Sequence, residues 1–263
     1  MNFNDKICLI TPPSPFLLDE RVFMHIGILK VASSLELKGI EVDVLDLSGV
    51  NNFEDVISDY ANSENSAKVF GITATTPQVP YAVKIAEQIR LIDSKNKLIL
   101  GGPHVTLMNA ASKMESKNGL EKSDSGKLSS FFDTLVCGDG EYSIFEALNT
   151  DDKIIDADDR KSSLFLKNKD FSELPPPARH LVDVNSYHYE IEGKKSISLI
   201  AQLGCPFKCA FCSGRNSPFL RKIRTRSIES IVTEIDHLYK TYGMTGFMFY
   251  DDEMNVNKSM IPL

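Results

Sequence analysis

The sequence predicts an α/β fold, in which a doubly wound, Rossmann-like parallel sheet is followed by the start of a second α/β unit. Five short runs of β-branched and apolar residues occur in the first 150 residues, separated by stretches of helical periodicity. The same alternation restarts after residue 195. In the first part the expected strands are 6–10, 42–45, 69–72, 98–100 and 134–136. The first expected helix contains Ile26, Leu29 and Leu35 and ends at Gly39, and the later ones are 53–60, 79–92 and 141–148.

The second unit is short. Residues 196–203 and 246–250 are expected strands, and Ser227 is the expected N-cap of a helix that runs to about Tyr242. A complete (β/α)8 barrel needs about 250 residues, whereas Ser196 to Leu263 comprises 68. We therefore expect only the first part of a barrel here, either as a fragment of a longer enzyme or as a unit that a separate chain completes.

Two polar segments interrupt the alternation. Residues 112–130 are rich in Ser, Lys, Glu and Gly, which predicts a mobile surface insertion. Residues 149–163 are acidic and read as an interdomain linker, which continues into a stiff stretch of three prolines at 175–177. The predicted domains are therefore a sheet domain at 1–150, a linker at 151–195 and a partial barrel at 196–263.

Composition excludes several classes of protein. The net charge of −7 argues against a general nucleic-acid binder, because neutralising phosphates requires a basic face. We find neither the basic and apolar start of a signal peptide nor an apolar run long enough for a membrane span. Five cysteines, three of them within eight residues, favour metal binding in a reducing cytoplasm over a disulfide framework.

The cysteine segment carries the strongest chemical signal. Cys205, Cys209 and Cys212 have the spacing Cys-x3-Cys-x2-Cys, which gives three thiolates that one short loop can place around an iron–sulfur cluster. Three ligands for a four-iron cluster leave one iron open, and an open position is typical of catalytic rather than structural metal sites. The alternative is a structural zinc knuckle with His188 or His237 as its fourth ligand, although such sites favour paired Cys-x2-Cys units.

An acidic group is expected on the same side of the second unit. The cysteines follow one predicted strand directly, and Asp251, Asp252 and Glu253 follow the next. In a parallel α/β barrel both loops open onto the face where such enzymes place their chemistry. A carboxylate there would pair with an ammonium group in a partly dry site, and the alternative is that these residues merely cap a strand end in water.

The cysteine segment resembles the motif of the radical S-adenosylmethionine (SAM) superfamily, including Phe211 before the third cysteine. The resemblance implies a 4Fe–4S cluster on the three cysteines that chelates SAM and cleaves it to a 5′-deoxyadenosyl radical. It also implies an electron donor such as flavodoxin or ferredoxin, Phe211 near the adenine, and Asp251, Asp252 and Glu253 near the SAM amino group. The basic run 221–226 is expected either to contact the SAM carboxylate or an anionic substrate, or to be a solvated loop.

Three loops of the sheet domain predict a ligand site. Open parallel sheets bind ligands at the carboxyl ends of their strands, where small residues allow the backbone to approach a ligand. No Gly-x-Gly-x-x-Gly follows the first strand, which disfavours a nicotinamide dinucleotide. The candidate ligand-binding residues of these loops are Thr73, Thr75 and Thr76, then Gly101, Gly102 and His104, then Gly138 and Glu141.

These loops, followed by the cysteine motif, resemble the cobalamin-binding class of radical SAM proteins. The resemblance rests on Gly101-Gly102-Pro103-His104 and on Gly138-Asp139-Gly140-Glu141, which differs from the class pattern at Asp139. It implies bound cobalamin. The Asp-x-His-x-x-Gly motif that supplies an axial histidine in other cobalamin proteins is absent, so we expect base-off cobalamin with another or no lower ligand. His104 is expected to line the pocket, and the alternative is a purely structural role. Cys8 and Cys137 are expected to be buried apolar residues.

Three functions are compatible with the sequence. The first is cobalamin-dependent radical SAM chemistry on a small molecule, such as methyl transfer to an unactivated carbon. The second is radical SAM chemistry without a corrin. The third is a binding module that holds a ligand or structural metal without catalysis.

Overall fold

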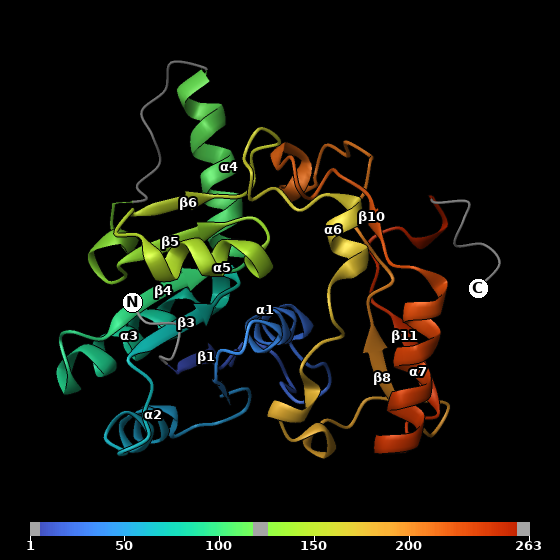
Figure 1. Cartoon of the computed structure of the whole chain (residues 1–263), viewed down its shortest axis with the longest axis horizontal. Coiled ribbons are helices and arrows are strands. Elements are labelled where there is room, and N and C mark those ends of the chain that lie inside the picture. The colour runs from blue at the N-terminus through green and yellow to red at the C-terminus, as the bar shows by residue number, and fades with distance from the viewer. Residues whose placement is uncertain (1–5, 118–125, 257–263) are drawn as a thin grey trace.

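The computed structural model describes residues 6–117 and 126–256 and has two α/β parts, seen at the left and right of Figure 1. The first part is a six-stranded sheet of order β2-β1-β3-β4-β5-β6, and all of its pairings are parallel. This confirms the predicted doubly wound fold. Its strands are β1 (Ile7–Thr11), β2 (Val42–Asp46), β3 (Val69–Thr73), β4 (Lys97–Gly101), β5 (Thr134–Cys137) and β6 (Ile154–Asp156), and its helices are α1 (Ile26–Leu37), α2 (Phe53–Ala61), α3 (Val79–Ile92), α4 (Pro103–Lys117) and α5 (Gly140–Asn149).

The strands bury both of their faces, because alternate residues enter different apolar clusters. In β1, Ile7 and Leu9 join the cluster that includes α1 and α5, whereas Cys8 and Ile10 join the one that includes α2, α3 and α4. A sheet covered on both sides reads as continuous apolar runs, which is why the strands were visible in the sequence. Cys8 and Cys137 are buried as expected, and burial raises the pKa of the Cys137 thiol to about 12.

Two elements lie where the sequence predicted irregular chain. Helix α4 extends to Lys117, so the first residues of the expected insertion at 112–130 are helical, while 118–125 lie outside the described residues. Among residues 103–116 of α4, only Val105, Thr106 and Ala110 are buried, too few to make a recognisable apolar stripe. Strand β6 lies inside the expected linker and pairs with β5, with Ile155 as its one buried residue.

The second part combines short strands with one long helix. Strand β8 pairs in parallel with β11 and antiparallel with β7, and α7 lies beside this small sheet (Figure 1). Ser227 caps α7 as predicted, its side chain accepting a hydrogen bond from the Ser230 amide. Strand β8 ends at Leu199 rather than at 203. The elements are α6 (Asn168–Glu173), β7 (Glu190–Ile191), β8 (Lys194–Leu199), β9 (Gln202–Leu203), β10 (Arg224–Thr225), α7 (Ile228–Tyr242) and β11 (Gly246–Phe249).

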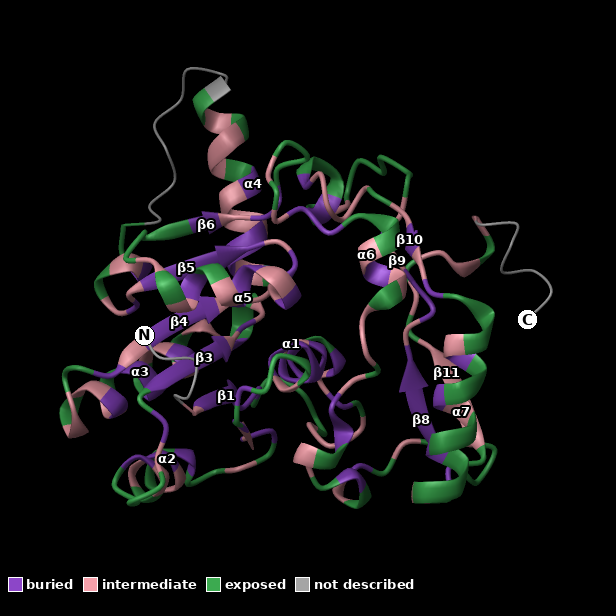
Figure 2. Cartoon of the chain, viewed as in Figure 1, coloured by how far each residue is buried: buried purple, intermediate pink, exposed green. Residues whose placement is uncertain are grey.

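One apolar cluster joins the two parts. Ile197 and Leu199 of β8 and Leu238 of α7 belong to the same buried cluster as Ile28 and Leu29 of α1. In Figure 2 the inner strands of the large sheet and β8 are mostly buried, whereas much of α7 is exposed. The shared core places the end of β8 close to the first part of the chain.

Candidate cofactor sites

A pocket lies at the carboxyl ends of the large sheet, between the two parts of the chain. Its cavity volume is about 230 Å³, and the space continues into open solvent. Its wall from the second part consists of Ile200 and Leu203. Its apolar lining from the first part comprises Leu9, Ile28, Val31, Ile72, Ile99, Val136 and Ile144, together with Gly27 and Gly71.

Five of the eight predicted sheet-domain residues line this pocket, namely Thr73, Gly101, Gly102, Gly138 and Glu141. Gly102 and Gly138 both have φ of +95°, which L side chains rarely adopt. A Cβ at Gly102 would lie 2.6 Å from Thr73 Oγ1, and one at Gly138 would lie 2.7 Å from the Ala157 carbonyl carbon. These glycines therefore allow neighbouring loops to pack closely and so shape the end of the pocket.

The other three, Thr75, Thr76 and His104, do not line the pocket. Thr75 donates its hydroxyl to Gln78 Oε1 at 2.8 Å, and Gln78 in turn donates to the carbonyl of Pro12 at 2.8 Å. The hydroxyl of Thr76 lies 3.1 Å from His104 Nδ1, and partial burial lowers the pKa of that histidine. These contacts stabilise the β3 loop against its neighbours, and a ligand role for the three residues stays a prediction.

Buried ion pairs occupy the acidic residues of the third loop. Glu141 contacts Lys30 at 3.0 Å, and Asp139 contacts Arg224 of β10, with all four side chains almost fully buried. The pair of Asp139 and Arg224 links the pocket loop to the second part. The sequence analysis noted Asp139 only as a departure from a pattern, since nothing local to it reveals a partner 85 residues away.

The cysteine loop begins at a glycine for a steric reason. Gly204 has φ of +87°, and a Cβ there would lie 2.2 Å from the carbonyl oxygen of Lys222. Cys205 then donates its amide to the Leu220 carbonyl at 2.9 Å, and the Cys212 amide donates to the Cys209 carbonyl at 3.1 Å. The three thiols are free, with Cys209 exposed and the other two half-buried.

The side chains around these thiols leave them accessible. Phe211 is 93% exposed, so a role for it beside an adenine stays a prediction. Within residues 6–116 and 126–256 no three Cys, His, Asp or Glu side chains are already arranged as a metal site. His188 contacts Asp19 and His237 contacts Thr241. Three unpaired thiols on one anchored loop are a donor set that fits an iron–sulfur cluster.

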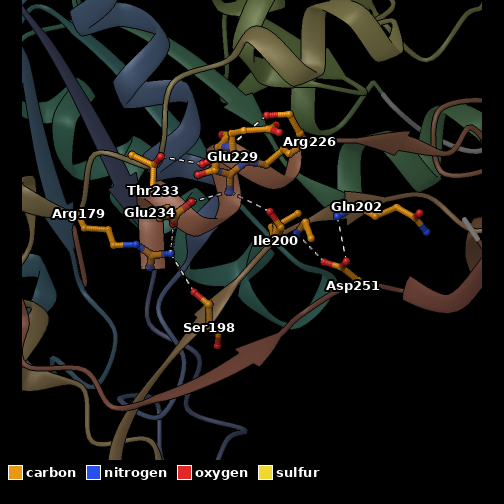
Figure 3. Close-up of polar contacts among 12 residues, drawn as sticks. Arg179, Ser198, Ile200, Gln202, Arg226, Glu229, Thr233, Glu234 and Asp251 are labelled. Carbon is orange, nitrogen blue, oxygen red and sulfur yellow. Dashed lines mark hydrogen bonds and ion pairs between the residues drawn. The ribbon is translucent and has the colours of Figure 1, made fainter. Parts of the chain in front are cut away.

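The acidic group after β11 is divided between two environments. Both carboxylate oxygens of Asp251 accept backbone amides at 2.9 Å, from Ala201 and Gln202, as Figure 3 shows. Burial raises the pKa of Asp251. Asp252 is exposed, and the Glu253 carbonyl accepts a hydrogen bond from Gln202 at 2.6 Å. Asp251 therefore holds the turn after β8, Asp252 faces solvent, and the half-buried Glu253 contributes its backbone carbonyl to the same turn.

Two arginines of the basic run 221–226 differ from both of the run's expected roles, whereas Lys222 is exposed. Arg224 and Arg226 are buried and ion-paired with Asp139 and Glu234 respectively. They are therefore neither a solvated loop nor free to contact an anionic ligand. The run contains internal counter-charges for two distant carboxylates, a role that the local pattern of alternating basic residues does not reveal.

Comparison with known proteins identifies the fold. Residues 21–118 match the B12 binding domain family. The structure matches a radical SAM methyltransferase, TsrM, from Kitasatospora setae, with a TM-score of 0.67 and 18% identity over 98% of this chain and 49% of that one. It also matches the cobalamin-dependent SAM radical enzyme OxsB, with a TM-score of 0.67 and 16% identity over 95% of this chain and 34% of that one. The chain has the fold of the cobalamin-binding radical SAM enzymes.

Similar sequences point the same way. An uncharacterized methyltransferase of Pyrococcus horikoshii is 26% identical over 96% of this chain and 54% of its own length. An anaerobic magnesium-protoporphyrin IX monomethyl ester cyclase of Cereibacter sphaeroides is 24% identical over 79% of this chain and 35% of its own length. The chain thus spans about half or less of these relatives. Among its described helices, none has the length and apolar character needed to cross a membrane.

Proposed function

We propose that this chain binds cobalamin in the pocket between its two parts and carries a 4Fe–4S cluster on Cys205, Cys209 and Cys212. Held by these three cysteines, such a cluster would supply the electron for reductive cleavage of SAM, and with cobalamin it would support a reaction on a small molecule, such as methyl transfer to an unactivated carbon. The observation that carries the proposal is the segment from Ile200 to Gly204, which forms one wall of the pocket and leads directly into the cysteine loop.

The lining of the pocket supports a corrin cofactor. Cobalamin joins a broad polar ring to a flat, apolar benzimidazole, which is released from the metal in the base-off form. A flat ring requires an apolar slot, and Leu9, Ile99 and Val136 provide one at the carboxyl ends of the sheet. A Cβ at Gly71 would lie 2.7 Å from Leu9 Cδ2, so a larger residue there would displace the side chain that lines this slot.

The chain's own residues have distinct tasks in the proposal. Ile200 and Leu203 shield the space between the two sites from water, which strengthens electrostatic interactions inside it. The ion pair of Lys30 and Glu141 neutralises two charges at the pocket wall, so a neutral amide side chain can approach. Asp252 is the carboxylate available to bind an ammonium group such as that of SAM. An electron donor such as flavodoxin or ferredoxin would supply the reducing electron.

Cobalamin binding is tested by filling the pocket. Gly27 lines it, and a Cβ there would meet nothing within 4 Å, so Gly27→Leu should extend a side chain into the pocket and weaken hydroxocobalamin binding about tenfold or more. Gly27→Ala is the matched control and should bind normally. The spectrum should be base-off and unchanged by His104→Ala. A base-on spectrum, or equal binding by Gly27→Leu, would contradict this part of the proposal.

The cluster is tested separately. Anaerobically reconstituted protein should hold about four irons per chain with matching sulfide, and Cys209→Ala should abolish the cluster. Cys137→Ala is the control, because that thiol is buried in β5 away from the loop. Uptake of one zinc without sulfide would favour the structural alternative and reject the radical SAM assignment.

A further inference from the structure

Three buried charges meet at the end of β8, two of them positive. Arg179, Arg226 and Glu234 are each at most 9% exposed. One oxygen of Glu234 contacts Arg179 at 3.0 Å, and the other contacts Arg226. Removing charges from water is expensive, and buried ion pairs are often no more stable than apolar replacements. A role in holding specific geometry explains such a group better than stability does.

These side chains take the place of a neighbouring strand. Arg179 donates to the Ser198 carbonyl at 2.9 Å and Arg226 donates to the Ile200 carbonyl at 3.1 Å (Figure 3). Carbonyls two residues apart point to the same edge of an extended chain. On this edge the pairing with β7 ends at Lys195, while β11 occupies the other edge. Guanidinium groups therefore hold the β8 edge where no strand does.

The held segment belongs to both candidate sites. Arg226 also donates its amide to the Ala201 carbonyl at 2.9 Å, and Asp251 accepts the amides of Ala201 and Gln202. Side chains therefore hold the backbone at Ser198, Ile200, Ala201 and Gln202, and pairing of Gln202 with Thr225 of β10 continues the contact. The next residues are Leu203, which lines the pocket, and Gly204, where the cysteine loop begins.

Arg179 connects this segment to the opposite wall of the pocket. The preceding residue, Ala178, donates its amide to the Leu29 carbonyl of α1 at 3.0 Å, and the neighbouring α1 residues Ile28 and Lys30 line the pocket. Arg179 itself lies 3.6 Å from the sulfur of Met24, just before α1. The polar contacts of Ala178 and Arg179 therefore join α1 to the end of β8, in addition to the apolar cluster that the two elements share.

We propose that Arg179 is a positioning residue that couples the occupancy of the pocket to the conformation of the cysteine loop. This inference rests on the proposed function, because it takes cobalamin as the group that fills the pocket. A group entering the pocket contacts α1 on one side and Ile200 and Leu203 on the other, and Arg179 fixes the spacing of these two walls. When they shift together, the loop shifts with them. Without Arg179 the walls keep only their apolar contacts, so the response of the loop should be weaker.

The experiment measures thiol reactivity in the cluster-free chain. Alkylation of Cys205, Cys209 and Cys212 by iodoacetamide is followed by mass spectrometry with and without hydroxocobalamin. In the wild type, hydroxocobalamin should change the loop rates by about fivefold or more, the lower end of usual coupling between sites. In Arg179→Met most of this change should disappear while hydroxocobalamin still binds, and Arg179→Lys should retain part of it.

Internal controls separate coupling from other effects. Cys8 and Cys137 are buried, so their alkylation reports unfolding in any variant. Should Arg179→Met unfold, Glu234→Gln removes the anchor of Arg179 and should give the same loss of response. Arg160→Met removes an exposed arginine and should behave as the wild type.

Each remaining outcome has one meaning. An equal response in the wild type and in folded Arg179 and Glu234 variants would show direct shielding of the loop by the corrin and overturn the coupling. Hydroxocobalamin that binds the wild type without changing loop reactivity would also overturn it and leave the proposed function intact. Absence of binding to the wild type would overturn the proposed cobalamin function first, and the coupling with it.

Discussion

The two parts of the molecule are stabilised in different ways. In the six-stranded sheet, the inner strands have neighbours on both edges and apolar residues on both faces. At the end of β8, one edge is held by arginine side chains and the turn by Asp251. Local apolar periodicity is enough to specify the first arrangement. The second depends on charges that meet only in the folded chain, so it is the part in which one substitution can alter geometry without removing the core.

The largest effect is expected in the sheet core. Phe70 of β3 is fully buried, and Phe70→Ala should lower the free energy of unfolding by about 3–5 kcal/mol through lost burial and a residual cavity. Leu91 on α3 is 81% exposed, so Leu91→Ala should change it by less than about 0.5 kcal/mol. Urea unfolding measures both. A small effect at Phe70 would mean that the sheet is not the stable unit we describe.

In the second part, removing the buried charge of Glu234 should lower the free energy of unfolding nearly as much. Glu234→Gln leaves two buried arginines without a counter-charge and should lower the free energy of unfolding by about 3 kcal/mol. Glu229→Gln, in the exposed first turn of the same helix, should cost about 0.5 kcal/mol or less. Equal effects at the two sites, measured by urea unfolding, would show that the buried network is not what holds α7 to β8.

The start of the cysteine loop allows a steric comparison. Gly204 and Gly193 both have positive φ, but a Cβ meets the Lys222 backbone only at Gly204. Both alanine variants therefore share the strain of a left-handed residue, and Gly204→Ala should cost about 1–3 kcal/mol more. It should also reduce iron incorporation, whereas Gly193→Ala should not. Normal iron content in Gly204→Ala would show that the loop tolerates a displaced start.

The sequence predicts the elements that have strong local apolar periodicity and misses those that depend on distant contacts. Helix α3 was predicted with both of its ends, and the first five strands lie where apolar runs indicated. Strand β6 was missed because Ile155 is its one buried residue, and α4 was missed because its few buried residues make no clear stripe. Elements with weak local signals are specified by what they pack against, which a single sequence does not display.

The candidate sites divide similarly. Small residues at strand ends predicted the pocket, and five of the predicted residues line it. The sequence did not predict that Asp139 and Glu141 would be engaged in ion pairs, or that Asp251 would hold a turn. Residue type and strand position indicate where a site lies, whereas the partner of each charge is fixed by long-range packing.

The smallest effect concerns pH at the junction of the two parts. Burial raises the pKa of Asp139 to about 6 despite the adjacent Arg224, so the folded state binds a proton more tightly than the unfolded chain, in which an aspartate titrates near 4. The stability that this group contributes is therefore fully present below about pH 4 and is lost as pH rises through about 6. Relative to Asp139→Asn, the wild type should become less stable from pH 4.5 to pH 7, as measured by urea unfolding. Asp19 should make the opposite contribution to the pH dependence of stability, because its hydrogen bond with His188 lowers its pKa. If the wild type instead became more stable than Asp139→Asn as pH rises, attraction to Arg224 would outweigh burial, and the two parts would be joined by a favourable ion pair.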